Sequence, residues 1–244
     1  MAKFEEAYFK IEDKSLSIEK YLDKIHYGKL YCPECFTAPL HIVRKQETAP
    51  YYASNSKQEH LEDCQHYEDF IANKRLNKFI DSKEVEDRER LDFLIKNNLQ
   101  GAINLLIKKE IMQKESLIKN DKNRDLKTAL ITPSSKYKRE SIPRVNIKRL
   151  FSKKEEYLDN YIIIWGSADI QSKIVNSKFK STMLIFRVKE KFRFSIKLTE
   201  TQINFYKELP NNPMNKGFAV FGLLRENNNF LELKLLTTKH LQYL

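Results

Sequence analysis

Glycine, proline and long apolar runs are all scarce in this chain. Its 244 residues include 5 glycines and 7 prolines, which excludes collagen-like and low-complexity classes. A hydrophobic share of 41% is too high for a disordered chain, and the length allows one or two domains with a real core. No stretch approaches the ~18 consecutive apolar residues of a membrane-spanning helix, so we expect no membrane partner.

Signals for export and for disulfide bonding are also missing. The first residues, MAKFEEAYFKIEDKS, mix charges and lack the apolar segment of a secretory signal. The three cysteines, Cys32, Cys35 and Cys64, are an odd number, which argues against a closed disulfide framework. A reducing compartment keeps such thiols free for metal. The sequence therefore predicts a cytoplasmic protein.

Positive charge is in excess, but it is unevenly spread. The chain has 44 Lys and Arg against 33 Asp and Glu, a net charge of +11. Residues 1–70 are acidic at −4, whereas residues 71–160 carry +8 and residues 161–244 carry +7. Two interpretations remain open. The lysines keep surfaces solvated, or they form an electrostatic footprint for a polyanion, which requires clustering on one face.

The apolar spacing divides the chain into three zones. Residues 1–119 form a predicted zinc-knuckle and helical domain, in which residues 67–119 show helical periodicity and Gly101 is a candidate break. Residues 120–160 are polar and basic with two prolines, and we expect a linker with a short helix. Residues 161–244 predict a β domain.

The β domain resembles an OB-fold, a five-stranded Greek-key barrel. Its strand-like runs are 161–169, 181–189, 192–199, 216–226 and 230–236. Between the third and fourth runs, residues 199–210 predict a helix, with Thr199 as N-cap and Gln202 as its capping-box partner. The predicted fold class is therefore α+β: an N-terminal zinc-knuckle module with a helical segment, followed by an OB-like barrel.

The cysteines have the spacing of a zinc site. Cys32 and Cys35 form a C-x2-C knuckle, whose turn directs both sulfurs to one side, and His60 and Cys64 form a matching H-x3-C pair. His66 is the rival nitrogen ligand. Cys32, Cys35, His60 and Cys64 fill a tetrahedral Cys3His site with no open position, so the predicted Zn²⁺ is structural.

These residues carry a family resemblance over roughly residues 28–68. The knuckle CPECFTAPLHIVR, then APYYAS, then HLEDC, resembles the N-terminal zinc module of competence protein CoiA-like proteins. Residues 51–54, YYAS, stand where that family has an aromatic segment flanked by histidines, and neither histidine is present here. The resemblance implies a zinc module.

The same family resembles restriction-type nucleases beyond its zinc module. Such a core needs an acidic residue and an E-x-K pair on adjacent strands to hold Mg²⁺ and activate water. The acids of residues 81–89, DSKEVEDRE, lie in a helical, charge-alternating stretch instead, which is typical of a solvated helix face. The sequence therefore does not predict catalysis.

A basic strand face is the candidate nucleic-acid site. Period-two alternation in two adjacent strands turns four basic residues outward, and the preceding loop, 167–180, adds three lysines and an aromatic for base stacking. The predicted contacts are Lys173, Lys178, Phe179, Lys180, Arg187, Lys189, Arg193 and Lys197. The competing interpretation is that outward strand positions are ordinarily polar, and Trp165 lies in an apolar run typical of a core.

The function that these features predict is non-catalytic binding of nucleic acid, single-stranded by preference, in DNA processing. Two alternatives stay open. One is a diverged CoiA-like nuclease that uses Mg²⁺ through Glu84 or Glu86. The other is a protein–protein adaptor in a DNA-processing or defence complex.

Overall fold

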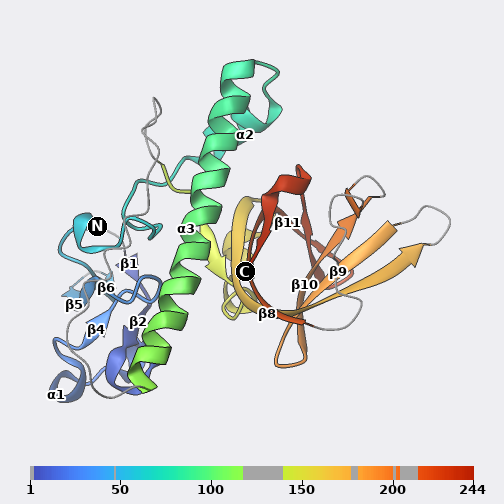
Figure 1. Ribbon diagram of the computed structural model, residues 1–244. Helices are drawn as coiled ribbons and strands as arrows, with labels where there is room; N and C mark the ends of the chain where they lie inside the picture. Colours follow the sequence, from blue (N-terminus) through green and yellow to red (C-terminus); the bar gives the residue numbers. More distant parts are fainter. Residues whose placement is uncertain (1–2, 47, 118–139, 177–180, 200–201, 204–213) are drawn as a thin grey trace. The chain divides into compact units, whose positions relative to one another are not determined.

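The chain divides into two compact units (Figure 1). The structure is a computed structural model that describes residues 3–46, 48–117, 140–176, 181–199, 202–203 and 214–244. Unit 1 is Met1–Phe70 and unit 2 is Ile71–Leu244. The first unit is the acidic part of the chain, at −4, and the second has 35 basic against 20 acidic residues, a net charge of +15.

Unit 1 is a small sheet of short antiparallel strands. In chain order they are β1 (Lys3–Phe4), β2 (Glu6–Phe9), β3 (Lys14–Ser17), β4 (Leu30–Tyr31), β5 (Pro39–Lys45) and β6 (Thr48–Ala53), with the short helix α1 (Asp23–His26) before β4. The order across the sheet is β1-β6-β5-β4-β2-β3. Alternation in β2 buries Ala7 and Phe9, and fully buried Tyr52 of β6 completes a modest core. So few buried side chains favour a unit that needs a further cross-link.

Two helices open unit 2, and both follow the predicted periodicity. They are α2 (Asn73–Asp81) and α3 (Val85–Leu117). Leu76 and Phe79 are the buried residues of α2, and α3 continues through Gly101 without a break. Among the described residues, no helix is both long and apolar enough to cross a membrane.

α3 packs on the barrel strands and α2 packs on α3, which differs from the predicted grouping of residues 1–119. Ile163 and Trp165 of β8, together with Ala219 and Phe221 of β11, are buried although they lie outside the barrel's interior cluster. They are covered because α3 packs on β8 and β11. Strands β9 and β10 lie on the far side of the barrel from α3 (Figure 1). The core position predicted for Trp165 is confirmed, at 4% exposed.

Residues 140–160 are part of unit 2 rather than a linker. They form β7 (Arg144–Asn146), which pairs parallel to β8, then a 3-10 turn (Phe151–Lys153) and the short helix α4 (Lys154–Tyr157). Glu140 accepts hydrogen bonds from Arg75 at 2.7 Å and from Arg90 at 3.3 Å. These bonds tie the segment to both helices. The remainder of the predicted linker, residues 120–139, lies outside the described residues.

Five strands close into a barrel, as the sequence predicted. They are β8 (Tyr161–Asn176), β9 (Ser181–Val188), β10 (Lys191–Leu198), β11 (Met214–Asn227) and β12 (Phe230–Lys234). The order around the barrel is β8-β9-β10-β12-β11, and β11 returns to pair with β8. Every pairing is antiparallel except β10 with β12. This closed, OB-like arrangement fixes which residues face in and which face out.

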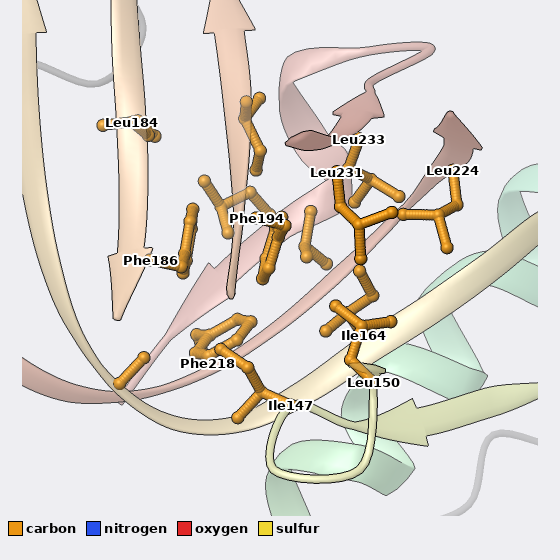
Figure 2. Packing of buried hydrophobic residues seen from close by; sticks show 14 of the residues in the cluster. Ile147, Leu150, Ile164, Leu184, Phe186, Phe194, Phe218, Leu224, Leu231 and Leu233 are labelled. Atoms are coloured by element: carbon orange, nitrogen blue, oxygen red, sulfur yellow. The ribbon is translucent and has the colours of Figure 1, made fainter. Parts of the chain in front are cut away.

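The barrel interior is filled by side chains from every strand and from the segment after β7 (Figure 2). Phe186 and Phe194 stack with ring centroids 4.3 Å apart, and Phe218 lies 4.8 Å from Phe186. Ile147 and Leu150, from the residues predicted as linker, are fully buried against this cluster. The interior is therefore a packed core rather than a ligand cavity.

Strand boundaries differ from the sequence prediction in two places. β8 runs to Asn176, so residues 167–176 belong to a strand instead of the predicted loop. A further strand, β13 (Leu241–Tyr243), pairs with β11. Of the predicted helix 199–210, only its start is described. There Gln202 Oε1 accepts a hydrogen bond from the Thr199 backbone N–H at 2.9 Å, which is one of the two bonds of the predicted capping box.

His240 couples the stability of unit 2 to pH. It is 5% exposed, and its ring packs edge-on against Phe221 with centroids 5.3 Å apart. Burial lowers the pKa of His240 to about 4, and the charge of Asp92 on α3 opposes this shift. Because the unfolded state binds the proton more tightly, stability is complete above about pH 6.5 and is lost as pH falls toward 4.

We expect His240→Leu to weaken the acid sensitivity of unit 2. Between about pH 7.5 and about pH 5, the wild type should lose about 2 kcal/mol more unfolding free energy than the variant. Urea unfolding followed by Trp165 fluorescence measures this, because the chain has 1 tryptophan and it lies in unit 2. His41→Gln, at an exposed histidine of unit 1, is the control. Parallel pH profiles for wild type and His240→Leu would contradict the assignment.

Candidate functional site

The knuckle of unit 1 is a tight turn that presents two sulfurs to one side. It follows β4 and precedes β5. The Cys32 N–H donates to the Ala38 carbonyl at 2.8 Å, and the Phe36 N–H donates to the Cys32 carbonyl at 2.9 Å. Phe36 has φ 61°, a left-handed conformation that turns the chain back toward β5. This local geometry is why a C-x2-C spacing can serve one metal ion.

The four predicted ligands come together in unit 1. Their donor atoms all lie within 4.8 Å of one another, and all four side chains are buried. The Cys32 and Cys64 sulfurs are 3.9 Å apart, and His60 Nδ1 lies 3.6 Å from Cys35 Sγ and 3.5 Å from Cys64 Sγ. Zinc–sulfur bonds of about 2.3 Å in a tetrahedron give edges of about 3.8 Å. The set Cys32, Cys35, His60 and Cys64 could therefore hold one metal ion.

Neighbouring groups orient the ligands. His60 presents Nδ1 to the sulfurs, while its Nε2 lies 3.1 Å from the Ser54 hydroxyl. A partner on the second ring nitrogen is the usual support of a metal-bound histidine. The Thr37 hydroxyl donates to Cys35 Sγ at 3.2 Å. These contacts hold the imidazole and one sulfur in place for coordination.

The electrostatics of the cluster favour a bound cation. Burial raises the pKa of the Cys32 and Cys64 thiols. Hydrogen bonds with Cys32 and Cys64, and then with His60, lower the pKa of the Cys35 thiol. Three thiolates cannot coexist in this dry space without positive charge. A divalent cation would supply that charge, so the donor set fits a thiophilic ion such as Zn²⁺.

His66, the rival ligand, points elsewhere. Its Nε2 lies 3.7 Å from the Glu34 carboxylate, and Glu34 Oε1 accepts a hydrogen bond from the Gln65 N–H at 3.4 Å. Glu34 is itself buried beside the knuckle at 5% exposed. The geometry therefore favours His60 over His66 as the nitrogen ligand.

We expect purified protein to contain about one zinc per chain, lost in Cys35→Ser and in His60→Ala but kept in the matched variant His66→Ala. Metal content by mass spectrometry and thiol accessibility measure this. Unit 1 should unfold without the ion, because its own core is small. Trp165 fluorescence should still report a folded unit 2. Zinc retained by His60→Ala and lost from His66→Ala would reverse the assignment.

The second candidate site is the outer wall of the barrel, where strand register places side chains in rows. Asp169 pairs with Arg187, which pairs with Phe192. At the other end of the wall, Lys173 pairs with Met183, which pairs with Lys197. The parallel pairing of β12 with β10 adds the outward residues Phe230 and Lys234 at these two ends. One end of the wall is therefore basic, and the other carries an arginine and two aromatic rings.

The predicted contact residues divide between this wall and other places. Lys173, Arg187 and Lys197 lie on the wall, and Arg187 Nη1 donates to Gln171 Oε1 at 3.1 Å. Lys189 is in the β9–β10 turn, with φ 51°. The Arg193 guanidinium lies over the Phe151 ring at 5.5 Å, so it packs against the chain after β7. Lys178, Phe179 and Lys180 lie outside the described residues.

Sequence alternation missed three residues of the wall. A register shift between Phe192 and Phe194 turns Phe192 outward, where strict alternation predicts an inward ring. Phe230 lies directly after the Asn228–Asn229 turn and is 60% exposed. Lys234 alternates outward with Phe230, at the exposed end of β12. The basic end comprises Lys173, Lys197 and Lys234, a set that we call the lysine row.

The acidic residues considered for a nuclease lie around the α2–α3 junction. Asp81 ends α2, and Glu84 and Glu86 flank the first residue of α3. They are exposed. Among the residues that the structure describes, the Cys/His cluster of unit 1 is the group able to hold a metal ion, and these acids are not part of one. Their placement agrees with a solvated helix face.

Comparison with known proteins assigns this chain to no family. No protein-family model matches the chain, and no curated protein matches it. Among solved structures, it is similar to one named as a putative aspartyl-tRNA synthetase from Leishmania major Friedlin, at 12% sequence identity and a TM-score of 0.31. The match covers 56% of this chain and 25% of the other chain. At that TM-score the similarity supports no conclusion about function.

Proposed function

We propose that this protein binds single-stranded nucleic acid, without cleaving it, on the outer wall of its barrel. The observation that carries the proposal is the lysine row on the open wall of an OB-like barrel. OB-folds bind oligonucleotides on the face of their second and third strands, which here are β9 and β10. Lys197 lies on β10, and Lys173 and Lys234 lie on β8 and β12, the strands to either side. In this proposal the ion of unit 1 is a structural Zn²⁺, and residues 28–68 resemble a CoiA-like zinc module.

The distribution of charge supports the wall as the contact surface. Unit 2 carries +15, against −4 for unit 1, so a polyanion is attracted to the barrel unit and repelled by the zinc unit. α3 packs on β8 and β11, while Lys173, near the C-terminal end of β8, and Lys197 and Lys234 remain exposed. Asp169 and Glu232 are outward as well, so contact is strongest at the basic end.

The chemistry of the row favours a backbone-directed, sequence-tolerant contact. Lysine ammonium groups are point charges that bind phosphate oxygens without a fixed fork geometry. Such contacts position a strand but carry no sequence information. The proposed activity is therefore binding with little base preference, in support of DNA processing.

A specific observation also favours a protein partner for unit 1. Ile25 in α1 and the residues that flank the helix, Leu22 and Tyr27, are 46%, 57% and 76% exposed, respectively. An exposed apolar group on an acidic unit suits a protein surface better than a nucleic acid. We propose this as a second function, in which unit 1 acts as an adaptor while unit 2 binds nucleic acid.

We expect replacement of the lysine row to reduce the salt dependence of binding. For a labelled single-stranded oligonucleotide, the triple variant Lys173→Ala, Lys197→Ala, Lys234→Ala should lower affinity. It should also reduce the slope of log K against log salt by about 2, since each phosphate contact contributes ~0.7. Fluorescence anisotropy across a salt series measures both quantities on protein of verified zinc content.

The matched control removes the same charge elsewhere in unit 2. Lys74, Lys78 and Lys83 lie on α2 or directly after it and are exposed, so their triple alanine variant should leave the slope nearly unchanged. Equal slopes for the two triple variants would remove the wall from the proposal. No binding by the wild type at low salt would favour the adaptor function. Shortened oligonucleotides in Mg²⁺ would favour a nuclease.

A further inference from the structure

The wall carries an aromatic pair that the barrel core does not use. Phe192 and Phe230 lie with ring centroids 5.5 Å apart at an interplanar angle of 90°. Phe230 is 60% exposed and Phe192 is half-buried. Neither residue belongs to the interior cluster, which includes Phe186, Phe194 and Phe218. The pair therefore lies on the outer wall and not in the barrel core.

Two backbone features, a register shift in β10 and the turn before β12, determine where the two rings lie. A one-residue register shift in β10 lies between Phe192, opposite Arg187, and Phe194, opposite Phe186. The shift takes Phe192 out of the inward series and places it beside an arginine. Phe230 is brought alongside because β12 runs parallel to β10 and starts at the tight Asn228–Asn229 turn, where φ is 49° and 66°. Bulges of this kind often re-aim a side chain next to a functional site.

We infer that Phe192 and Phe230 form a stacking site for an unpaired base, and that this site gives the protein its preference for single strands. The inference rests on the proposed function and adds a substrate class: oligonucleotides with exposed bases. A perpendicular pair leaves ring faces that neither partner covers. Stacking on such faces tolerates every base, because each base has a π-face, and it is unavailable to bases inside a duplex.

The flanking residues suit a nucleotide. Arg187, on the neighbouring strand directly opposite Phe192, can contact a phosphate or sugar while a base occupies the rings. The lysine row lies four residues farther along the strands, about 13 Å away at ~3.3 Å per residue. A ligand that engages both ends is therefore an oligonucleotide, with bases at the aromatic pair and phosphates at the row.

The test separates base stacking from phosphate binding. The probes are an oligothymidylate and an abasic oligonucleotide of the same length and charge. Wild-type protein should bind the oligothymidylate about 5- to 100-fold more tightly, which is the range expected from stacking one base. Phe230→Leu should remove this difference without changing the salt slope. Phe230→Tyr, which keeps a ring, should retain it, and Phe192→Leu should act as Phe230→Leu does.

Each outcome bears on one claim. Equal wild-type affinity for the two probes would overturn the stacking site while leaving phosphate binding on the wall intact. No binding of either probe at low salt would overturn the proposed function itself. A control substitution, Tyr27→Leu, removes a ring that is 76% exposed on unit 1 and should preserve the difference between the probes. Loss of the difference in Tyr27→Leu would move the stacking site away from Phe192 and Phe230.

Discussion

Closure of the barrel is the constraint on which the arrangement of unit 2 depends. β11 pairs with β8 over ten registered positions, from Met214 opposite Ile170 to Leu223 opposite Tyr161. Closure leaves no free edge within the barrel and forces each strand to divide its residues between a packed interior and an outer wall. Gly222 is required at this seam, because a Cβ there would lie 2.6 Å from the Lys234 carbonyl oxygen. The same division decides which charged residues can meet a ligand.

The two units solve the stability problem in different ways. Unit 2 buries a large apolar interior, to which the chain after β7 and the start of the helix after β10 contribute Ile147, Leu150 and Ile203. Unit 1 has short strands and a small core, and its four buried donor atoms lie within 4.8 Å of one another. A metal ion held by these four residues would take the place of additional hydrophobic area in unit 1. The units are thus physically suited to separate roles.

The sequence predicts those features whose pattern is local. The alternation of Leu184, Phe186 and Val188, the clustering of the C-x2-C and H-x3-C residues and the hydrogen bond from the Thr199 N–H to Gln202 appear in the structure as expected. The OB-like strand order also follows from the count and spacing of strand-like runs. These signals are short, because each depends on residues within a few positions of one another.

Features that depend on tertiary packing could not be predicted from the sequence in the same way. The polar composition of residues 140–160 predicted a linker. Ile142, Ile147 and Leu150 in this segment are nevertheless buried, because they pack against other parts of unit 2. The outward turn of Phe192 depends on a one-residue register shift, which simple alternation cannot show. Arg193 was predicted on the basic strand face, but its guanidinium packs over the Phe151 ring, a contact between residues far apart in the sequence. The grouping of α2 and α3 with the barrel likewise depends on which surface their apolar faces meet.

The one-sided covering of the barrel by α3 determines how a polymer could reach it. Among the described residues of unit 2, the wall formed by β9 and β10 is an outer surface rather than an enclosed channel, and the interior is filled (Figures 1 and 2). A nucleic-acid strand bound on such a wall would approach it from the side, and no free end would have to pass through a channel. Circular molecules and gaps within long duplexes would therefore be as accessible as linear oligonucleotides. Release would likewise require no sliding to a terminus.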